Sequence, residues 1–313
     1  MIKLLLITLV TTFTTTAFAA KFDGCVAQFN SRVQQRISKG VPTKHLPRLY
    51  LPAYNPKQTV VIFTHGMFES PYFFKGINKV FQDQGFVSIS ILLPGHWQGD
   101  WSNMKKVSYR EWQSEIRENI KLAQCFGKKV IFAGHSLGGL LSMDAALANP
   151  GITEGVLLWS PAVDVRASVS IGGFLGGLLH LNGNTFFEGA ANLDETPLYS
   201  PNAAKQMSAL IKNVRETHGN GTMKNVYGKI KAPTFLAYAE RDPAVDVDEI
   251  TRAAYSISGL SKEYTMYFPE TTHVWHGNIT KNREDVYKKA KWDYNLKWES
   301  MQARVESFMR KFY

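Results

Sequence analysis

Metal-ligand and nucleotide-binding motifs are missing from this sequence of 313 residues. Its only two cysteines, Cys25 and Cys125, are too few and too far apart for a cysteine-rich metal cluster. No Walker, G-x-G-x-x-G or H-E-x-x-H pattern occurs, so no nucleotide, zinc ion or other cofactor is implied. In an oxidising compartment the two cysteines allow one disulfide, with two unpaired thiols as the alternative.

Charged residues make up only 20% of the chain, against 44% apolar residues, and this balance predicts a packed globular fold. The formal net charge of +10 favours anionic surfaces. Because the Lys and Arg residues are scattered, we expect no nucleic-acid partner. Peripheral contact with an anionic membrane is the expectation that remains, and a solvated surface is its alternative.

The N-terminus has the pattern of a secretory signal peptide. Lys3 precedes the apolar run 4–10, and the small residues of 17–20 include an A-x-A cleavage site. We predict a signal peptide over 1–19, cleaved after Ala19, and a periplasmic or secreted protein. Threonines between 8 and 16 disfavour the alternative of an uncleaved membrane anchor. Lipidation at Cys25 is a weaker alternative, because small and apolar residues do not precede it.

Short apolar strands alternate with helical segments after a polar lead-in over 20–58. The expected strands are 59–64, 86–92, 130–133, 156–159, 234–238 and 264–268. Such alternation predicts an α/β fold with a mostly parallel sheet covered on both faces. We expect helices over 71–84 and from Ser108 to Gln124, the latter with Glu111 completing a capping box.

One block interrupts this alternation. Residues 164–231 are too long for a loop and contain the apolar, Gly-rich stretch 171–179. We predict that 164–231 form an inserted cap over the site, with 59–163 and 232–313 as the core. The alternative is a structural insertion that packs elsewhere.

The run Gly134-His135-Ser136-Leu137-Gly138 lies between an expected strand and an expected helix. A nucleophilic serine at such a sharp turn needs neighbours without bulk two positions away on each side, which Gly134 and Gly138 provide. The strand–turn–helix context makes Ser136 the predicted nucleophile. Its hydroxyl needs an imidazole base that is itself oriented by a carboxylate.

Candidates for the acid and the base follow later strands. The run 239–245 directly follows the strand 234–238 and contains Asp242, which is the favoured acid, with Asp164 and Asp246 as rivals. His273 and His276 both follow the last strand. His273 is nearer to that strand and is the favoured base, and His276 is held in reserve.

The charged tetrahedral intermediate of acyl transfer also needs hydrogen-bond donors. The backbone N–H groups of Leu137, which opens a helix, and of Met67, which follows Thr64-His65-Gly66, are predicted to form an oxyanion hole. His65 is expected to brace that loop, and His96 to be structural.

These features together resemble the α/β-hydrolase superfamily, and most closely its lysophospholipase and monoacylglycerol-lipase branch, which shares its pattern with the serine aminopeptidase S33 domain. The resemblance is carried by Thr64 to Glu69, Leu93-Pro94-Gly95-His96, Gly134 to Gly139, Asp242 and His273, and it covers about 59–313. It implies hydrolysis of a carboxylic ester through an acyl-enzyme. Two departures, Phe68 and Trp97 in place of glycines, are expected to put bulk near the acyl side of the pocket.

The expected substrate is a small acyl ester or lipid, such as a lysophospholipid or monoacylglycerol, because the apolar cap and the aromatic residues Phe68, Phe73 and Phe74 suit a fatty chain. Two alternatives stay open. An S33-type exopeptidase would need an acidic cluster in the cap, for which Glu188, Asp194 and Glu195 are candidates. An inactive envelope-binding protein is the other.

Overall fold

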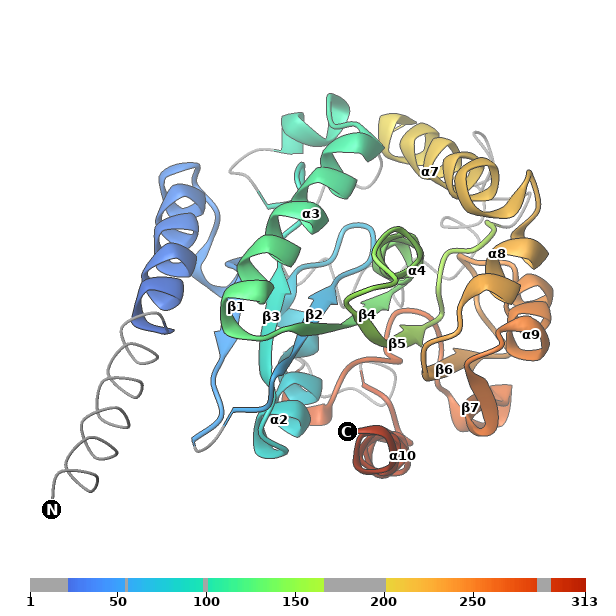
Figure 1. Cartoon of the computed structure of the whole chain (residues 1–313). Coiled ribbons are helices and arrows are strands. Elements are labelled where there is room, and N and C mark those ends of the chain that lie inside the picture. The colour runs from blue at the N-terminus through green and yellow to red at the C-terminus, as the bar shows by residue number, and fades with distance from the viewer. Residues whose placement is uncertain (1–21, 54–55, 98–100, 166–200, 286–293) are drawn as a thin grey trace, which may run out of the picture.

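A seven-stranded sheet forms the centre of the protein (Figure 1). The computed structural model describes residues 22–53, 56–97, 101–165, 201–285 and 294–313. The strand order is β1-β3-β2-β4-β5-β6-β7, and every neighbouring pair is parallel except β1 with β3. The strands are β1 (Arg48–Tyr50), β2 (Thr59–Thr64), β3 (Val87–Ile91), β4 (Lys129–His135), β5 (Thr153–Trp159), β6 (Thr234–Ala239) and β7 (Leu260–Phe268). This confirms the predicted α/β fold class.

Helices cover both faces of the sheet (Figure 1). They are an N-terminal helix over residues 22–38, α2 (Lys75–Asp83), α3 (Tyr109–Phe126), α4 (Leu137–Ala148), α7 (Pro201–Gly219), α8 (Met223–Lys229), α9 (Val247–Ser256) and α10 (Trp298–Phe312). Successive side chains of β2 point to opposite faces of the sheet and pack into two different cores. Val60 and Ile62 join the core under α3 and α4, whereas Val61 and Phe63 join the core against α2 and α10.

Local sequence signals fix several boundaries. Ser108 and Glu111 form the expected capping box at the start of α3, with the Ser108 side chain accepting from the Glu111 N–H and the Glu111 carboxylate accepting from the Ser108 N–H. The expected helix over 71–84 instead begins as a 3-10 turn (Pro71–Phe74) and becomes α-helical from Lys75. Ser70 caps that turn by accepting a hydrogen bond from the Tyr72 N–H.

The lead-in is more regular than its sequence suggests, because it contains both the N-terminal helix and the edge strand β1. A disulfide joins Cys25 on that helix to Cys125 on α3, with their Cα atoms 5.9 Å apart. This resolves the choice between a disulfide and two free thiols. The predicted signal peptide over 1–19 lies outside the described residues.

Of the predicted cap, the structure describes residues 164–165 and 201–231, and the latter contain α7 and α8. The stretch 171–179 and the carboxylates Glu188, Asp194 and Glu195 lie outside the described residues. Helix α7 packs on α3 and α4 (Figure 1). None of the helices that the structure describes is long and apolar enough to span a membrane.

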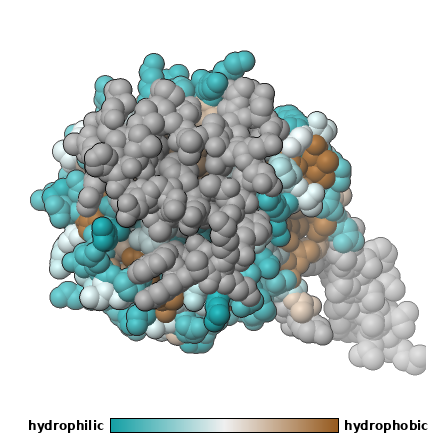
Figure 2. Space-filling view, turned by 180° about the vertical axis from the view of Figure 1, so that it is seen from behind, coloured by the Kyte–Doolittle hydropathy of each residue, from teal (hydrophilic) through white to brown (hydrophobic). Residues whose placement is uncertain are grey.

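Exposed apolar side chains are scattered on the described surface. The large ones are Ile37, Tyr255, Tyr267 and Phe312. In the view of Figure 2 the coloured surface is mostly hydrophilic, and the hydrophobic areas are small and separate. Single exposed apolar residues of this kind are ordinary for a folded protein and do not define an interaction patch.

Candidate active site

Ser136 occupies a strained turn between β4 and α4. Its φ of 53° and ψ of −119° lie in a region that non-glycine residues rarely adopt. A Cβ at Gly134 would overlap the carbonyl group of Gly138, and a Cβ at Gly138 would overlap that of Thr64. The two glycines are therefore required for β4, β2 and α4 to approach closely enough to form this turn.

Asp242 lies at the carboxyl edge of the sheet, in the loop after β6, and its side chain is buried. Its Oδ1 accepts hydrogen bonds from the N–H groups of Ala244 at 2.9 Å and Val245 at 3.1 Å. Its Oδ2 accepts from Nδ1 of His276 at 2.7 Å. Burial opposes ionisation of Asp242, but His276 and the two N–H groups outweigh it and hold the pKa of the carboxyl below its usual value.

His276 is 5% exposed, and its pKa is affected both by this burial and by its contact with Asp242. Burial lowers the pKa of His276, yet the Asp242 carboxylate outweighs burial and raises it above the ordinary histidine value. Because Asp242 binds the proton on Nδ1, the other ring nitrogen, Nε2, is left as the basic one. His276 and Ser136 line the same cavity.

The predicted pairing of Asp242 with His273 is wrong: the histidine hydrogen-bonded to Asp242 is His276. After β7 the chain makes a 3-10 turn (Glu270–Thr272), and His273 ends that turn with a φ of 57°. Its N–H donates to the Glu270 carbonyl at 3.0 Å, and its own carbonyl accepts from the Asn278 side chain at 3.1 Å. The residues nearest to the strand, His273 among them, thus form the turn. The histidine that contacts Asp242 is therefore His276, three positions further along the chain.

The rival acids have other partners. Asp164 accepts from Nη2 of Arg215 on α7 at 2.6 Å. Asp246 caps α9, where its side chain accepts from the Glu249 N–H at 3.0 Å. Both carboxylates are therefore accounted for by the packing of helices, which agrees with the preference for Asp242.

One predicted oxyanion-hole donor belongs to the residue after Ser136, and the other to a residue that lines the same cavity. Leu137 is the first residue of α4, so its N–H has no acceptor within the helix. Met67 lines the cavity with Ser136. Neither N–H donates to another group among the described residues. Unused N–H groups beside a nucleophilic serine are what an oxyanion requires.

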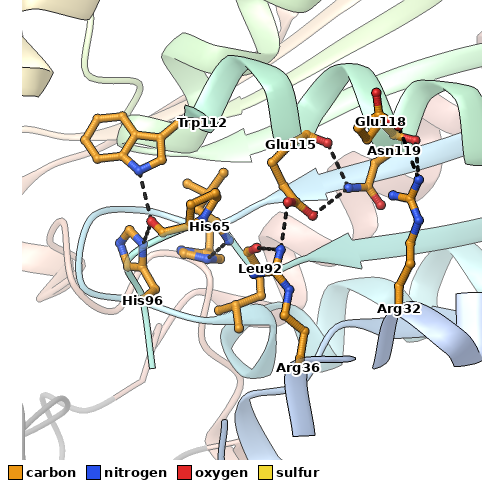
Figure 3. A network of polar contacts seen from close by, with 11 residues as sticks. Arg32, Arg36, His65, Leu92, His96, Trp112, Glu115, Glu118 and Asn119 are labelled. Atoms are coloured by element: carbon orange, nitrogen blue, oxygen red, sulfur yellow. Dashed lines mark hydrogen bonds and ion pairs between the residues drawn. The ribbon is translucent and has the colours of Figure 1, made fainter. Parts of the chain in front are cut away.

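Two buried histidines hold the loop that carries Met67 (Figure 3). His65 accepts from the Leu93 N–H at Nε2 (3.1 Å), so its Nδ1 donates to the Gly66 carbonyl (2.8 Å). In the same way, His96 accepts from the Phe68 N–H at 3.2 Å. Burial lowers the pKa of His65 to about 4 and that of His96 well below its usual value. Both rings are therefore neutral at ordinary pH, as these hydrogen bonds require, and His65 braces the loop as expected.

The network extends to the N-terminal helix (Figure 3). Arg36 donates to Glu115 on α3 at 2.7 Å and to the Leu92 carbonyl at 3.4 Å. Trp112 on α3 donates from Nε1 to the Pro94 carbonyl at 3.1 Å. The lead-in is thus linked through the loop after β3 to the loop that carries the proposed oxyanion donor.

The cavity beside Ser136 is mainly apolar. Its apolar lining comes from the loops after the strands and from α7, and consists of Met67, Phe68, Phe73, Ala162, Val165, Ala203, Ala204, Met207, Ala244 and Val245. Phe68 and Phe73 therefore lie where we expected them. Phe74 does not, because it packs under the sheet against Phe63. Trp97 also differs: it stacks on His45, with ring centroids 3.6 Å apart, and is not part of the described lining.

Two charged residues of this cavity were given no role by the sequence analysis, Glu69 and Lys281. Glu69 accepts from Nδ1 of His135, the residue before the serine, at 2.8 Å. Lys281 is 7% exposed, and its Nζ lies 4.4 Å from the centroid of the Phe73 ring. In the sequence, Glu69 is marked only as the last residue of the run Thr64 to Glu69, which is part of the family resemblance.

Comparisons with known proteins agree with this geometry. The family model described as serine aminopeptidase, S33, matches residues 55–215. The chain belongs to this family. Phospholipase YtpA of Bacillus subtilis (strain 168) is 27% identical to this S33-family chain over 113 residues, which make up 36% of the chain and 43% of that phospholipase. The match therefore spans less than half the length of that relative.

Solved α/β-hydrolase structures share the fold of this S33-family chain. A monoacylglycerol lipase of Paleococcus ferrophilus is 17% identical with a TM-score of 0.59, over 85% of this chain and 98% of the lipase. A structure of the metagenome-derived lipolytic enzymes LipS and LipT is 15% identical with a TM-score of 0.58, over 87% and 99%. At such identities the likeness shows the fold, and with the family match it identifies the chain as an α/β-hydrolase enzyme.

Proposed function

We propose that this protein hydrolyses carboxylic esters, with Ser136 as nucleophile, His276 as general base and Asp242 as the carboxylate that orients it. One observation carries the proposal: Ser136 and the Asp242-bound His276 face one mainly apolar cavity. An apolar cavity with a few convergent polar groups is the usual form of a site for an acyl substrate.

The chemistry follows from these positions. Ser136 Oγ attacks the ester carbonyl carbon and gives its proton to Nε2 of His276, while the N–H groups of Met67 and Leu137 bind the oxygen that becomes negative. His276 then protonates the leaving alcohol as the acyl-enzyme forms. Water, deprotonated by His276, attacks the acyl-enzyme, and the proton returns to Ser136 as the acid leaves.

The proposed substrate is an acyl ester of a lipid, such as a lysophospholipid or monoacylglycerol. Support comes from the apolar lining and from relatives described as a phospholipase and a monoacylglycerol lipase. The test is hydrolysis of p-nitrophenyl acyl esters of increasing chain length, then of the two lipid classes. We expect activity that Ser136→Ala abolishes; activity that survives this substitution would refute the mechanism.

The family description also leaves an exopeptidase as a second candidate. Alanine and proline arylamides belong in the same assay. Their cleavage, without ester hydrolysis, would replace the ester proposal by the peptidase one. If the folded wild-type protein cleaves neither esters nor arylamides, a binding role is favoured instead.

We also propose that the protein is exported, with cleavage after Ala19. The disulfide between Cys25 and Cys125 supports this, because such bonds persist mainly in oxidising compartments. The intact mass of the protein recovered from a periplasmic or culture fraction would test it. A mass that retains residues 1–19 would count against cleavage.

A further inference from the structure

A second carboxylate, Glu69, lies partly buried beside the serine turn and takes no part in the proton transfers above. Its Oε2 accepts from the Gly66 N–H at 2.9 Å and from His135 Nδ1 at 2.8 Å. Its backbone carbonyl accepts from Nε1 of Trp97 at 3.0 Å. Both the side chain and the backbone of Glu69 are therefore fixed, and the carboxylate joins the oxyanion loop to the serine turn.

Gly66 shows how closely these groups approach one another. A Cβ added at Gly66 would lie 2.8 Å from Glu69 Oε2, 3.0 Å from His135 Nδ1 and 3.1 Å from Ser136 Cβ. Gly66 directly precedes Met67. Since Glu69 binds the N–H of Gly66 and His65 binds its carbonyl, the direction of the Met67 N–H is set from both sides.

The negative charge of Glu69 also affects the pKa of the general base, His276. Burial opposes its ionisation, but His135, Lys281 and the Gly66 N–H outweigh burial and lower the pKa of Glu69 to about 2. The His135 ring lies with its centroid 4.7 Å from that of His276. His276 thus faces the carboxylates of Asp242 and Glu69, which raise its pKa, and the ammonium of Lys281, which lowers it.

We propose that Glu69 is a positioning residue of the hydrolytic site, which fixes the turn presenting the Met67 N–H and holds the His135 ring against His276. It exchanges no proton with the substrate. Its fixed negative charge favours the imidazolium form of His276 during the reaction. The inference rests on the ester hydrolysis proposed above and adds a residue to it.

Glu69→Gln keeps the shape of the side chain and removes its charge. We expect kcat to fall about 10- to 100-fold, less than the full loss of an oxyanion donor, with KM changed by less than about 3-fold. The acidic limb of the kcat/KM profile, which reports the base, should move to lower pH by about half a unit or more. Glu69→Asp restores the charge and should return the limb towards its wild-type position.

The Asp144–His218 pair provides a matched control. It joins α4 to α7 with a distance of 2.9 Å between Oδ1 and Nε2, and its side chains are 13% and 12% exposed, against 13% for Glu69. Asp144→Asn therefore removes a comparable carboxylate–histidine contact outside the cavity. We expect it to lower thermal stability and leave the acidic limb in place.

The outcomes separate this inference from the proposed function. A Glu69→Gln protein with wild-type kcat and an unmoved acidic limb would overturn the role of Glu69 while wild-type ester hydrolysis stands. If Glu69→Gln does not fold, Glu69→Asp is the deciding variant, because it keeps the charge and shortens the side chain. A reduced kcat then supports the positioning role of Glu69, and a wild-type kcat overturns it. A wild-type protein that does not react with a fluorophosphonate at Ser136 would overturn the proposed function and this inference with it.

Discussion

Replacing His276 by alanine tests the assignment of the general base. His276 is buried and donates to Asp242 across 2.7 Å. Without it, Ser136 has no imidazole to take its proton, and loss of the triad histidine lowers kcat by about 10⁶-fold. That factor corresponds to about 8 kcal/mol of transition-state stabilisation. The buried Asp242 also loses a partner, which costs about 3 kcal/mol of folding stability.

The matched control is His273→Asn. Asparagine tolerates the left-handed backbone of position 273, where φ is 57°. We expect kcat within about 3-fold of wild type, as for a substitution away from the chemistry. The assay is kcat and KM on one p-nitrophenyl acyl ester, with a thermal unfolding curve for each variant. Equal losses in the two variants, or kcat within tenfold of wild type in His276→Ala, would refute the reasoning.

Three further predictions concern stability and pH. Reducing the Cys25–Cys125 disulfide, which spans a sequence separation of 100, should lower the free energy of unfolding by about 4 kcal/mol in urea titrations; an unchanged midpoint would contradict this. The pKa of His65 is lowered from 6.5 to about 4 in the folded protein, so between these pH values the unfolded state binds a proton that the folded state does not. The free energy of unfolding should therefore fall by about 3 kcal/mol as pH drops from 6.5 to 4. His65→Asn should reduce this dependence of stability on pH. Lys281→Met removes a cation that lowers the pKa of His276, so the acidic limb of kcat/KM should move to higher pH, opposite to Glu69→Gln.

The parallel sheet could be predicted because its strands are short runs of β-branched and apolar residues, buried on both faces. Strand β2, for example, is buried at all six positions. Strand β1 was not predicted, since its three residues are only half-buried and belong to a polar segment. It forms by pairing with β3, a tertiary contact that no local pattern contains.

The candidate site was predictable in part for the same reason. Ser136 directly follows β4 and Asp242 comes three positions after the end of β6, so these strand ends bring both residues to one edge of the sheet. The histidine was misjudged because distance along the chain is a poor guide once a turn intervenes between β7 and the edge. Glu69 was missed because its contact with His135 joins the loop after β2 to the end of β4.

The most direct test of the central claim is the reaction of the folded, wild-type protein with a fluorophosphonate, followed by peptide mass spectrometry. We predict one adduct per chain, on the peptide that contains Ser136, and a labelling rate that falls steeply in His276→Ala but not in His273→Asn. A stable adduct on another serine, or equal labelling of Ser136→Ala, would contradict the account.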